Sequence, residues 1–164
     1  MVPSTPLHKL LFHEGLPPLV MTSANPSDEP LCSDNDEALQ RLRHMVDGFL
    51  LHDRDIERRV DDSVWIGPGA TPVRRSRGYV PEPIAVTPAA HTPILALGGD
   101  LKAAVAIMAD AHVVLSEHLG DLSNARTYRH FTRTVQHFQQ LFQIEPATIA
   151  CDLHPDYAST RYAR

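Results

Sequence analysis

Four of the fourteen prolines in this chain fall within residues 80–93 (VPEPIAVTPAAHTP), a stretch with few charges. Proline fixes φ and has no backbone N–H, so neither a helix nor an inner strand is expected to run through such a segment. The segment predicts a linker over residues 83–93. It divides the 164 residues into a first unit, 1–82, and a second unit, 94–164.

The first unit alternates short apolar runs with helix signals. Residues 19–22 form a strand candidate, and residues 60–66 form another. Between them, 33–36 are rich in residues that cap helix N-termini. Apolar residues then recur at helical spacing from 39 to 49, which predicts a helix there.

The second unit has a clearer pattern. Residues 94–97 predict an apolar strand, and residues 103–115 predict a hairpin that turns at 109–111. A strongly amphipathic helix is expected from Asn124 until Pro146 ends it, and 148–151 predict a buried strand. Strand, hairpin, helix and strand in this order indicate an α/β fold.

The composition excludes several classes of protein. Hydrophobic residues make up 43% and charged residues 21%, which is typical of a globular protein. The net charge of −5 argues against nucleic acid as a partner, although local basic clusters could bind phosphate. No apolar run is long enough to cross a membrane, and the first residues do not form a signal peptide. Cys32 and Cys151 stand far apart, which favours reduced thiols in a cytoplasm over a disulfide framework or zinc ribbon.

Three motifs in the first unit could bind phosphate groups. The small polar residues 22–25 (TSAN) follow the strand candidate at 19–22, where ligands often bind in α/β sheets, or they form only a turn. Residues 54–64 alternate in charge and end in a strand with two carboxylates and a serine, and they form an anion site or a solvated charged loop. Three arginines within 74–77 form a concentrated anion site or a basic surface strand.

Two further motifs lie in the second unit. Residues 97–102 (LGGDLK) run from a strand into a Gly-Gly turn that suits a phosphate contact, although a plain turn fits too and no P-loop is present. Residues 152–160 (DLHPDYAST) follow the last strand, and N-capping by Asp156 is a simpler role than metal ligation. Because no complete set of metal ligands occurs, we expect no metal site in this chain.

The order of six segments resembles the HypF family of hydrogenase-maturation carbamoyltransferases. They are TSANPSDEP, FLLHDRDIERRVDDSV, PVRRSRGYVPEPI, ILALGGDLKAAVAI, SEHLGDL and ACDLHPDYASTRYA. The resemblance covers nearly the whole chain. It implies the C-terminal part of a YrdC-like α/β domain, the Pro-rich linker, and the N-terminal part of an actin/hexokinase-like (ASKHA) domain.

The resemblance also implies two groups of site residues. Those of the nucleotide site are Ser23, Asn25, Arg58, Asp62, Ser63, Arg75 and Arg77. Those of the transfer-domain cleft are Gly98, Gly99, Asp100, Lys102, Asp121 and Asp152. No catalytic residue is assigned. The zinc and iron sites of the family are expected outside this chain.

By this resemblance the parent enzyme makes carbamoyl-adenylate from carbamoyl phosphate and ATP, with magnesium accompanying the ATP. It then transfers the carbamoyl group to the C-terminal cysteine of a HypE-type partner during [NiFe]-hydrogenase maturation. Family members are several times longer, so this chain is expected to be a fragment and inactive alone. The alternatives are a YrdC-like threonylcarbamoyl-adenylate synthase of tRNA modification and a non-catalytic truncated module.

Overall fold

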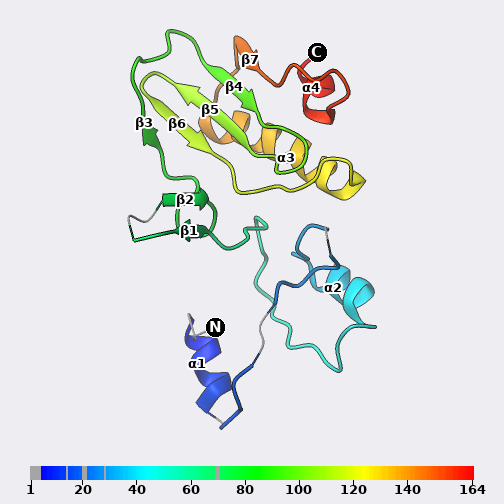
Figure 1. Ribbon diagram of the computed structural model, residues 1–164. Coiled ribbons are helices and arrows are strands. Elements are labelled where there is room, and N and C mark those ends of the chain that lie inside the picture. The colour runs from blue at the N-terminus through cyan, green and yellow to red at the C-terminus, as the bar shows by residue number, and fades with distance from the viewer. Residues whose placement is uncertain (1–4, 14, 20–21, 28, 69–70) are drawn as a thin grey trace.

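The computed structural model describes residues 5–13, 15–19, 22–27, 29–68 and 71–164. Its two units lie one above the other, with the N-terminus in the lower unit and the C-terminus in the upper one (Figure 1). The first unit contains helices α1 (Pro6–His13) and α2 (Asn35–Leu42) and the antiparallel pair β1 (Val64–Ile66) and β2 (Thr71–Arg74).

The second unit is built on a five-stranded sheet in the order β3-β6-β5-β4-β7. Its strands are β3 (Ile84–Ala85), β4 (Ile94–Leu97), β5 (Val105–Ala109), β6 (His112–Leu115) and β7 (Thr148–Ala150). The strands from β3 to β4 pair antiparallel, and β7 pairs with β4 in parallel. The predicted strand at 94–97 and the hairpin after it are therefore confirmed, and Asp110 at the hairpin turn takes the left-handed φ of 51°.

Helix α3 (Ala125–Phe142) covers one face of this sheet (Figure 1). The helix begins where it was expected, and Asn124 caps it, because its side chain accepts hydrogen bonds from two backbone N–H groups of the first turn. The helix ends with Gln143 in the left-handed conformation, three residues before Pro146. Its buried side chains meet those of the sheet in one core, which includes Leu95, Leu97, Val105, Ile107, Val114, Phe131, Val135 and Phe138.

The structure differs from the sequence prediction in the linker and the last strand. Residues 84–85 are not free linker, since β3 pairs with β6 and Val86 N–H donates to the carbonyl of Ala111. The prediction of a buried strand at 148–151 was wrong, because all three residues of β7 are exposed at the edge of the sheet. Periodicity could not reveal that the described residues of this chain leave β7 exposed.

The first unit also departs from its pattern. The helix predicted up to residue 49 ends at Leu42, and the apolar residues beyond it, such as Met45 and Phe49, remain exposed. The strand predicted at 60–66 is regular only from Val64, and part of the strand predicted at 19–22 lies outside the described residues. Where no core is present to bury an apolar face, periodicity alone does not sustain an element.

Burial is unequal between the units. Among the described residues before 83, only Leu42 and Ser76 are buried, whereas Trp65, Ile66 and Val73 are exposed. The second unit therefore holds the core, and the first unit leaves much apolar surface uncovered within this chain. No helix in the described ranges combines the length and apolarity needed to cross a membrane.

Candidate nucleotide site between the two units

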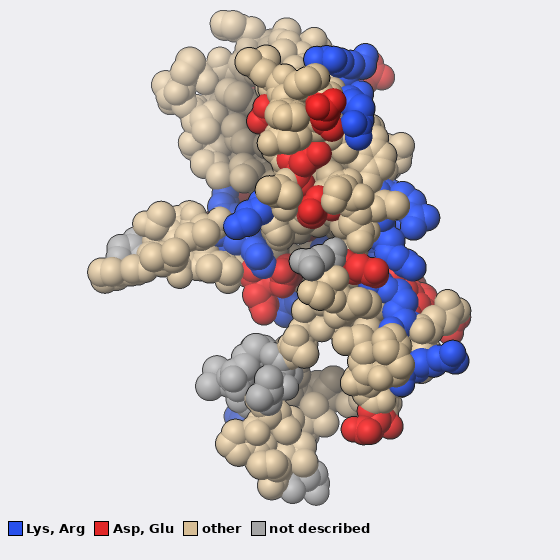
Figure 2. All heavy atoms as spheres, turned by 45° about the vertical axis from the view of Figure 1, so that its right-hand side comes forward, with Lys and Arg blue, Asp and Glu red and all other residues tan. Residues whose placement is uncertain are grey.

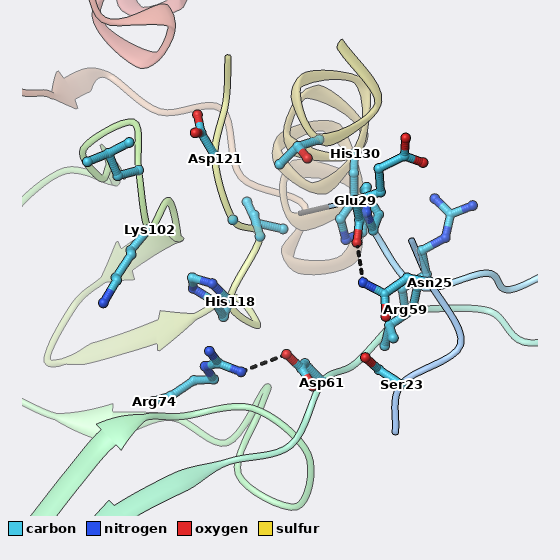
Figure 3. Close-up of a pocket in the computed structure, with 16 residues that line it drawn as sticks. Ser23, Asn25, Glu29, Arg59, Asp61, Arg74, Lys102, His118, Asp121 and His130 are labelled. Carbon is cyan, nitrogen blue, oxygen red and sulfur yellow. Dashed lines mark hydrogen bonds and ion pairs between the residues drawn. The ribbon is translucent and has the colours of Figure 1, made fainter. Parts of the chain in front are cut away.

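A cavity of about 300 Å³ lies where the two units meet, and both contribute to its wall (Figure 3). The first unit supplies Ser23, Asn25, Glu29, Pro30, Leu31, Arg59, Asp61 and Arg74. The second supplies Leu101, Lys102, His118, Leu119, Gly120, Asp121, Thr127 and His130. We call this space the inter-unit cavity. It brings together four residues that the sequence assigned to two separate sites: Ser23, Asn25, Lys102 and Asp121.

The turn around Asn25 is held by its own hydrogen bonds. Asn25 N–H donates to the carbonyl of Ser23, and its side-chain Nδ2 donates to the carbonyl of Glu29 at 2.7 Å. Cys32 N–H closes the loop on the carbonyl of Ala24 at 2.8 Å. The buried Oδ1 of Asn25 has no donor among the described residues. The turn is thus ordered by its own hydrogen bonds, while the exposed hydroxyl of Ser23 remains for a ligand.

An ion pair and a histidine line another part of the cavity wall. Arg74 on β2 contacts Asp61 at 2.6 Å, and His118 follows β6 beside them (Figure 3). Burial lowers the pKa of His118, and the positive charges of Arg74 and Lys102 lower it further against the opposing effect of Asp61. His118 is therefore neutral at pH 7, with an imidazole nitrogen able to accept a proton.

Lys102 and Asp121 stand on the second unit's side of the cavity, across from Asn25 and Arg59 of the first unit, and in Figure 3 the Lys102 amine points downward and the Asp121 carboxylate points upward. Lys102 is exposed on the turn after β4. The Asp121 carboxylate accepts a hydrogen bond from Ser123 N–H, which lowers its pKa. A cation and an ionised carboxylate are thus both available to a ligand that lies between the units.

A second cavity, of about 440 Å³, lies on the first unit beside Ser23. Here the TSAN turn faces the charged loop, since residues 22–24 and 58–62 line the same space together with Arg77. Arg77 pairs with Asp62 at 3.5 Å and donates to the carbonyl of Val60 at 3.0 Å. The TSAN turn and the start of residues 61–64 (the DDSV segment) are therefore neighbours.

Ser63 and Arg75 line neither of these cavities, and their side chains form hydrogen bonds with backbone atoms of nearby residues. The Ser63 hydroxyl donates to the carbonyl of Arg77 and accepts from the N–H of Ser76, both at 2.9 Å. Arg75 donates to the carbonyl of Tyr79 at 3.2 Å. These contacts join the DDSV segment to residues 74–78 (the RRSRG segment), so the two motifs stabilise each other's backbone.

Arg58 reaches into the second unit. Its Nη2 lies 2.8 Å from both carboxylate oxygens of Glu117, and its guanidinium stacks over the Phe138 ring at 5.4 Å. Glu117 is 2% exposed and also lies 3.3 Å from His130. Burial opposes ionisation of Glu117, but the hydrogen bonds from His130 and Arg58 outweigh it and lower its pKa. Arg58 therefore joins the two units through a buried ion pair.

The remaining residues of the predicted transfer cleft have structural contacts. The Asp100 carboxylate accepts from the backbone N–H groups of Ala158 and Ser159 at 2.9 and 3.2 Å. It thereby caps helix α4 (Ala158–Ala163), whose own N-cap residue makes no side-chain bond, so the expected capping by Asp156 is wrong. A local motif could not predict a cap supplied from another turn.

Gly98 and Gly99 occupy the same turn as Asp100, but only Gly98 is tightly enclosed. A Cβ at Gly98 would lie 3.0 Å from the backbone oxygen of Ala104, whereas at Gly99 the nearest atom would be 3.8 Å away. Asp152 is exposed and caps its own loop by accepting from His154 N–H at 2.9 Å. Among the described residues, no group of three or more His, Cys, Asp or Glu side chains could hold a metal ion.

Sequence reasoning gave no role to three residues at this junction: Glu117, His118 and His130. Arg59 and Arg74 lie in the basic segments 54–64 and 74–77, which were predicted as anion sites, but nothing in the spacing distinguished them from Arg58 and Arg75. Glu117 and His118 lie in the SEHLGDL segment that carried the family resemblance, without a role attached. His130 lies within the amphipathic helix, where a single histidine gives no signal.

Comparison with known proteins finds a different family model in each half of the chain. Residues 1–75 match the model of the Sua5/YciO/YrdC family, described as "Telomere recombination". Residues 89–164 match a model described as "HypF Kae1-like domain". The chain thus joins part of a YrdC-type domain to part of a Kae1-like domain.

Relatives that cover the whole chain make the assignment specific. Carbamoyltransferase HypF of Synechocystis is 45% identical over 99% of this chain, and the probable carbamoyltransferase HypF of Methanocaldococcus jannaschii is 36% identical over 99%. A crystal structure of full-length HypF in a phosphate- and nucleotide-bound form superimposes with a TM-score of 0.92 at 40% identity, over 99% of this chain and 26% of that one. HypF of T. kodakarensis gives 0.84 at 35% identity, over 95% of this chain and 21% of that one.

Along nearly its whole length, the chain is similar to one segment of the HypF carbamoyltransferases. It spans 22% of the length of each of the two relatives named above.

Proposed function

We propose that this chain forms the inter-unit nucleotide site of a HypF-type carbamoyltransferase. The enzyme makes carbamoyl-adenylate from carbamoyl phosphate and ATP in its YrdC-like part. It then transfers the carbamoyl group to the C-terminal cysteine of a HypE-type partner during [NiFe]-hydrogenase maturation. The free thiols of Cys32 and Cys151 suit a cytoplasmic enzyme.

The observation that carries this proposal is the inter-unit cavity. Ser23 and Asn25 of the YrdC-type unit and Lys102 and Asp121 of the Kae1-like unit line one space of about 300 Å³. An adenylate made against one wall could therefore meet transfer residues on the other wall without crossing solvent. Such closeness protects a reactive acyl intermediate from hydrolysis.

The side chains suggest a division of tasks. Asn25 and Ser23 offer hydrogen bonds to the adenylate, and Arg59 and Lys102 offset its phosphate charge. His118, kept neutral by its surroundings, is placed to accept the proton of the attacking thiol. Magnesium bound to ATP would find oxygen ligands in Asp61 and Asp121, which both line the cavity.

A chimera tests the proposal. This chain replaces the corresponding segment of the Synechocystis HypF, and two half-reactions are measured: carbamoyl-phosphate-dependent ATP–pyrophosphate exchange, and carbamoyl transfer to a HypE-type acceptor. Lys102→Ala is expected to reduce transfer about tenfold or more while sparing exchange, since the proposal assigns Lys102 to the transfer step, in which it offsets the phosphate charge of the adenylate.

Lys9→Ala is the matched control, because Lys9 is exposed on α1 and lies outside the cavity. Unchanged transfer in Lys102→Ala would remove Lys102 from the site, and equal loss of both half-reactions would indicate a folding defect. The isolated chain is expected to catalyse neither reaction, because its first unit lacks a core. Robust exchange by the chain alone would contradict that expectation.

A further inference from the structure

Five of the eight residues that line a third, smaller cavity beside the inter-unit cavity are arginines. This cavity measures about 150 Å³ and lies between α2 and the first half of α3. Its lining residues are Pro30, Glu37, Arg41, Arg59, Arg126, Arg129, His130 and Arg133. We call it the arginine cavity. Figure 2 shows Lys and Arg side chains gathered on the side of the molecule at the height where the two units meet.

The carboxylates near the arginine cavity do not balance its positive charge. Glu37 pairs with Arg41 and Arg59 at 2.6 and 2.8 Å. Glu29, just beside the cavity, pairs with Arg41 at 2.7 Å and lies 3.6 Å from Arg126. Among the residues that the structure describes, two carboxylates thus face five arginines, which leaves an excess of three positive charges around the cavity in a chain whose net charge is −5.

Several guanidinium donors have no acceptor. Arg41 is 10% exposed and Arg59 is 22% exposed, and the buried Nε of each has no hydrogen-bond partner among the described residues. In the same part of the chain, neither Arg129 nor Arg133 forms an ion pair, although both line the cavity and are exposed. Like charges held close together repel one another, so an anion bound between them would lower the electrostatic free energy of the cluster.

The arginine cavity is next to the proposed nucleotide site. Pro30, Arg59 and His130 line both cavities, so a ligand that fills one can extend toward the other. Arginine is suited to this place because its planar guanidinium binds phosphate oxygens in pairs. The excess charge suits a small ligand with several negative charges better than a single carboxylate.

We propose that the arginine cavity binds pyrophosphate. This inference rests on the proposed function: in adenylate formation an oxygen nucleophile attacks the α-phosphorus of ATP, and the bond from that phosphorus to the bridging oxygen breaks. Pyrophosphate leaves with the bonding electron pair. Its negative charge then meets the arginines of α3, which lie next to the cavity in which the adenylate remains.

The test is calorimetric titration of sodium pyrophosphate into the chimeric enzyme that carries this chain. Arg129→Gln/Arg133→Gln is expected to weaken pyrophosphate binding about tenfold or more, since each lost guanidinium removes charge-assisted hydrogen bonds. The two side chains are exposed, so their replacement does not disturb the core. Arg54→Gln, which removes one charge at an exposed position outside the cavity, is the control and should leave binding unchanged.

Competition separates the possible sources of phosphate. ATP should compete with pyrophosphate, AMP should not, and inorganic phosphate should bind at least tenfold more weakly. Equal binding by AMP or by inorganic phosphate would overturn the assignment, as would unchanged affinity in the double variant or an equal loss in Arg54→Gln. Since the readout is binding, intact pyrophosphate binding together with an inactive chimera would refute the proposed reaction and leave the cavity assignment standing.

Discussion

Replacing Arg58 by Met should destabilise the fold more than any other surface-loop substitution in the first unit. Arg58 is 22% exposed, but its partner Glu117 is 2% exposed and lies in the second unit. Met keeps an apolar stem against Phe138 but leaves the Glu117 carboxylate with His130, at 3.3 Å, as its remaining ionic partner.

The magnitude follows from which charge is left buried. Removing one partner of a buried ion pair costs about 3–5 kcal/mol. Water can reach the Arg58 side of this pair, so the lower end, about 3 kcal/mol, applies to Arg58→Met. Glu117→Gln leaves only the more exposed arginine unpaired and retains a hydrogen-bond acceptor, so it should cost less, about 1.5 kcal/mol. The double variant should lose about 1–2 kcal/mol less than the sum of the two.

Urea unfolding at pH 7 measures these values with two probes. Circular dichroism at 222 nm reports mainly on α3, the longest helix, and fluorescence of Trp65 reports on the first unit. Because the pair joins the units, both transitions should shift to lower urea in Arg58→Met. Arg54→Met, at an exposed position, should change stability by less than about 0.5 kcal/mol.

Two results would refute this reasoning. The first is a loss of less than about 1 kcal/mol in Arg58→Met, which would mean that the carboxylate is solvated or protonated without it. The second is a shift in only one of the two transitions, which would mean that the ion pair does not hold the units together.

Three other variants test separate features. The pKa of His118 is lowered by folding, so the folded state binds fewer protons, and stability should fall as the pH drops below about 6.5. His118→Gln should reduce that loss of stability in urea titrations between pH 7 and 5.5. An identical pH dependence in the variant would contradict the lowered pKa of His118. Asp100→Ala removes the cap from α4 and should cost about 1–2 kcal/mol in thermal or urea unfolding, whereas Asp152→Ala, which removes a cap within an exposed loop, should cost less. Gly98→Ala forces a Cβ against backbone and should cost about 1–3 kcal/mol, while Gly99→Ala, with 3.8 Å of room, should be nearly neutral; equal effects would show that the turn can shift.

Local sequence determined much of the second unit. The helix cap at Asn124, the apolar spacing along α3 and the hairpin turn at Asp110 depend on residues within a few positions of one another. Such contacts form between sequence neighbours, so periodicity and turn chemistry predict them. The order of the motifs likewise indicated the family before the fold was known.

Only the tertiary structure decided how the motifs meet. Arg58 and Glu117 are 59 residues apart in the chain, and so are Asp100 and Ser159, yet each pair is in contact. Arg58 thus joins the units and Asp100 caps a helix, where the sequence predicted ligand contacts for both. Spacing along a chain carries no information about such long-range pairs, because their geometry is fixed by the packing of whole elements. The inter-unit cavity, which joins Asn25 to Lys102 across the two units, arises from the same packing.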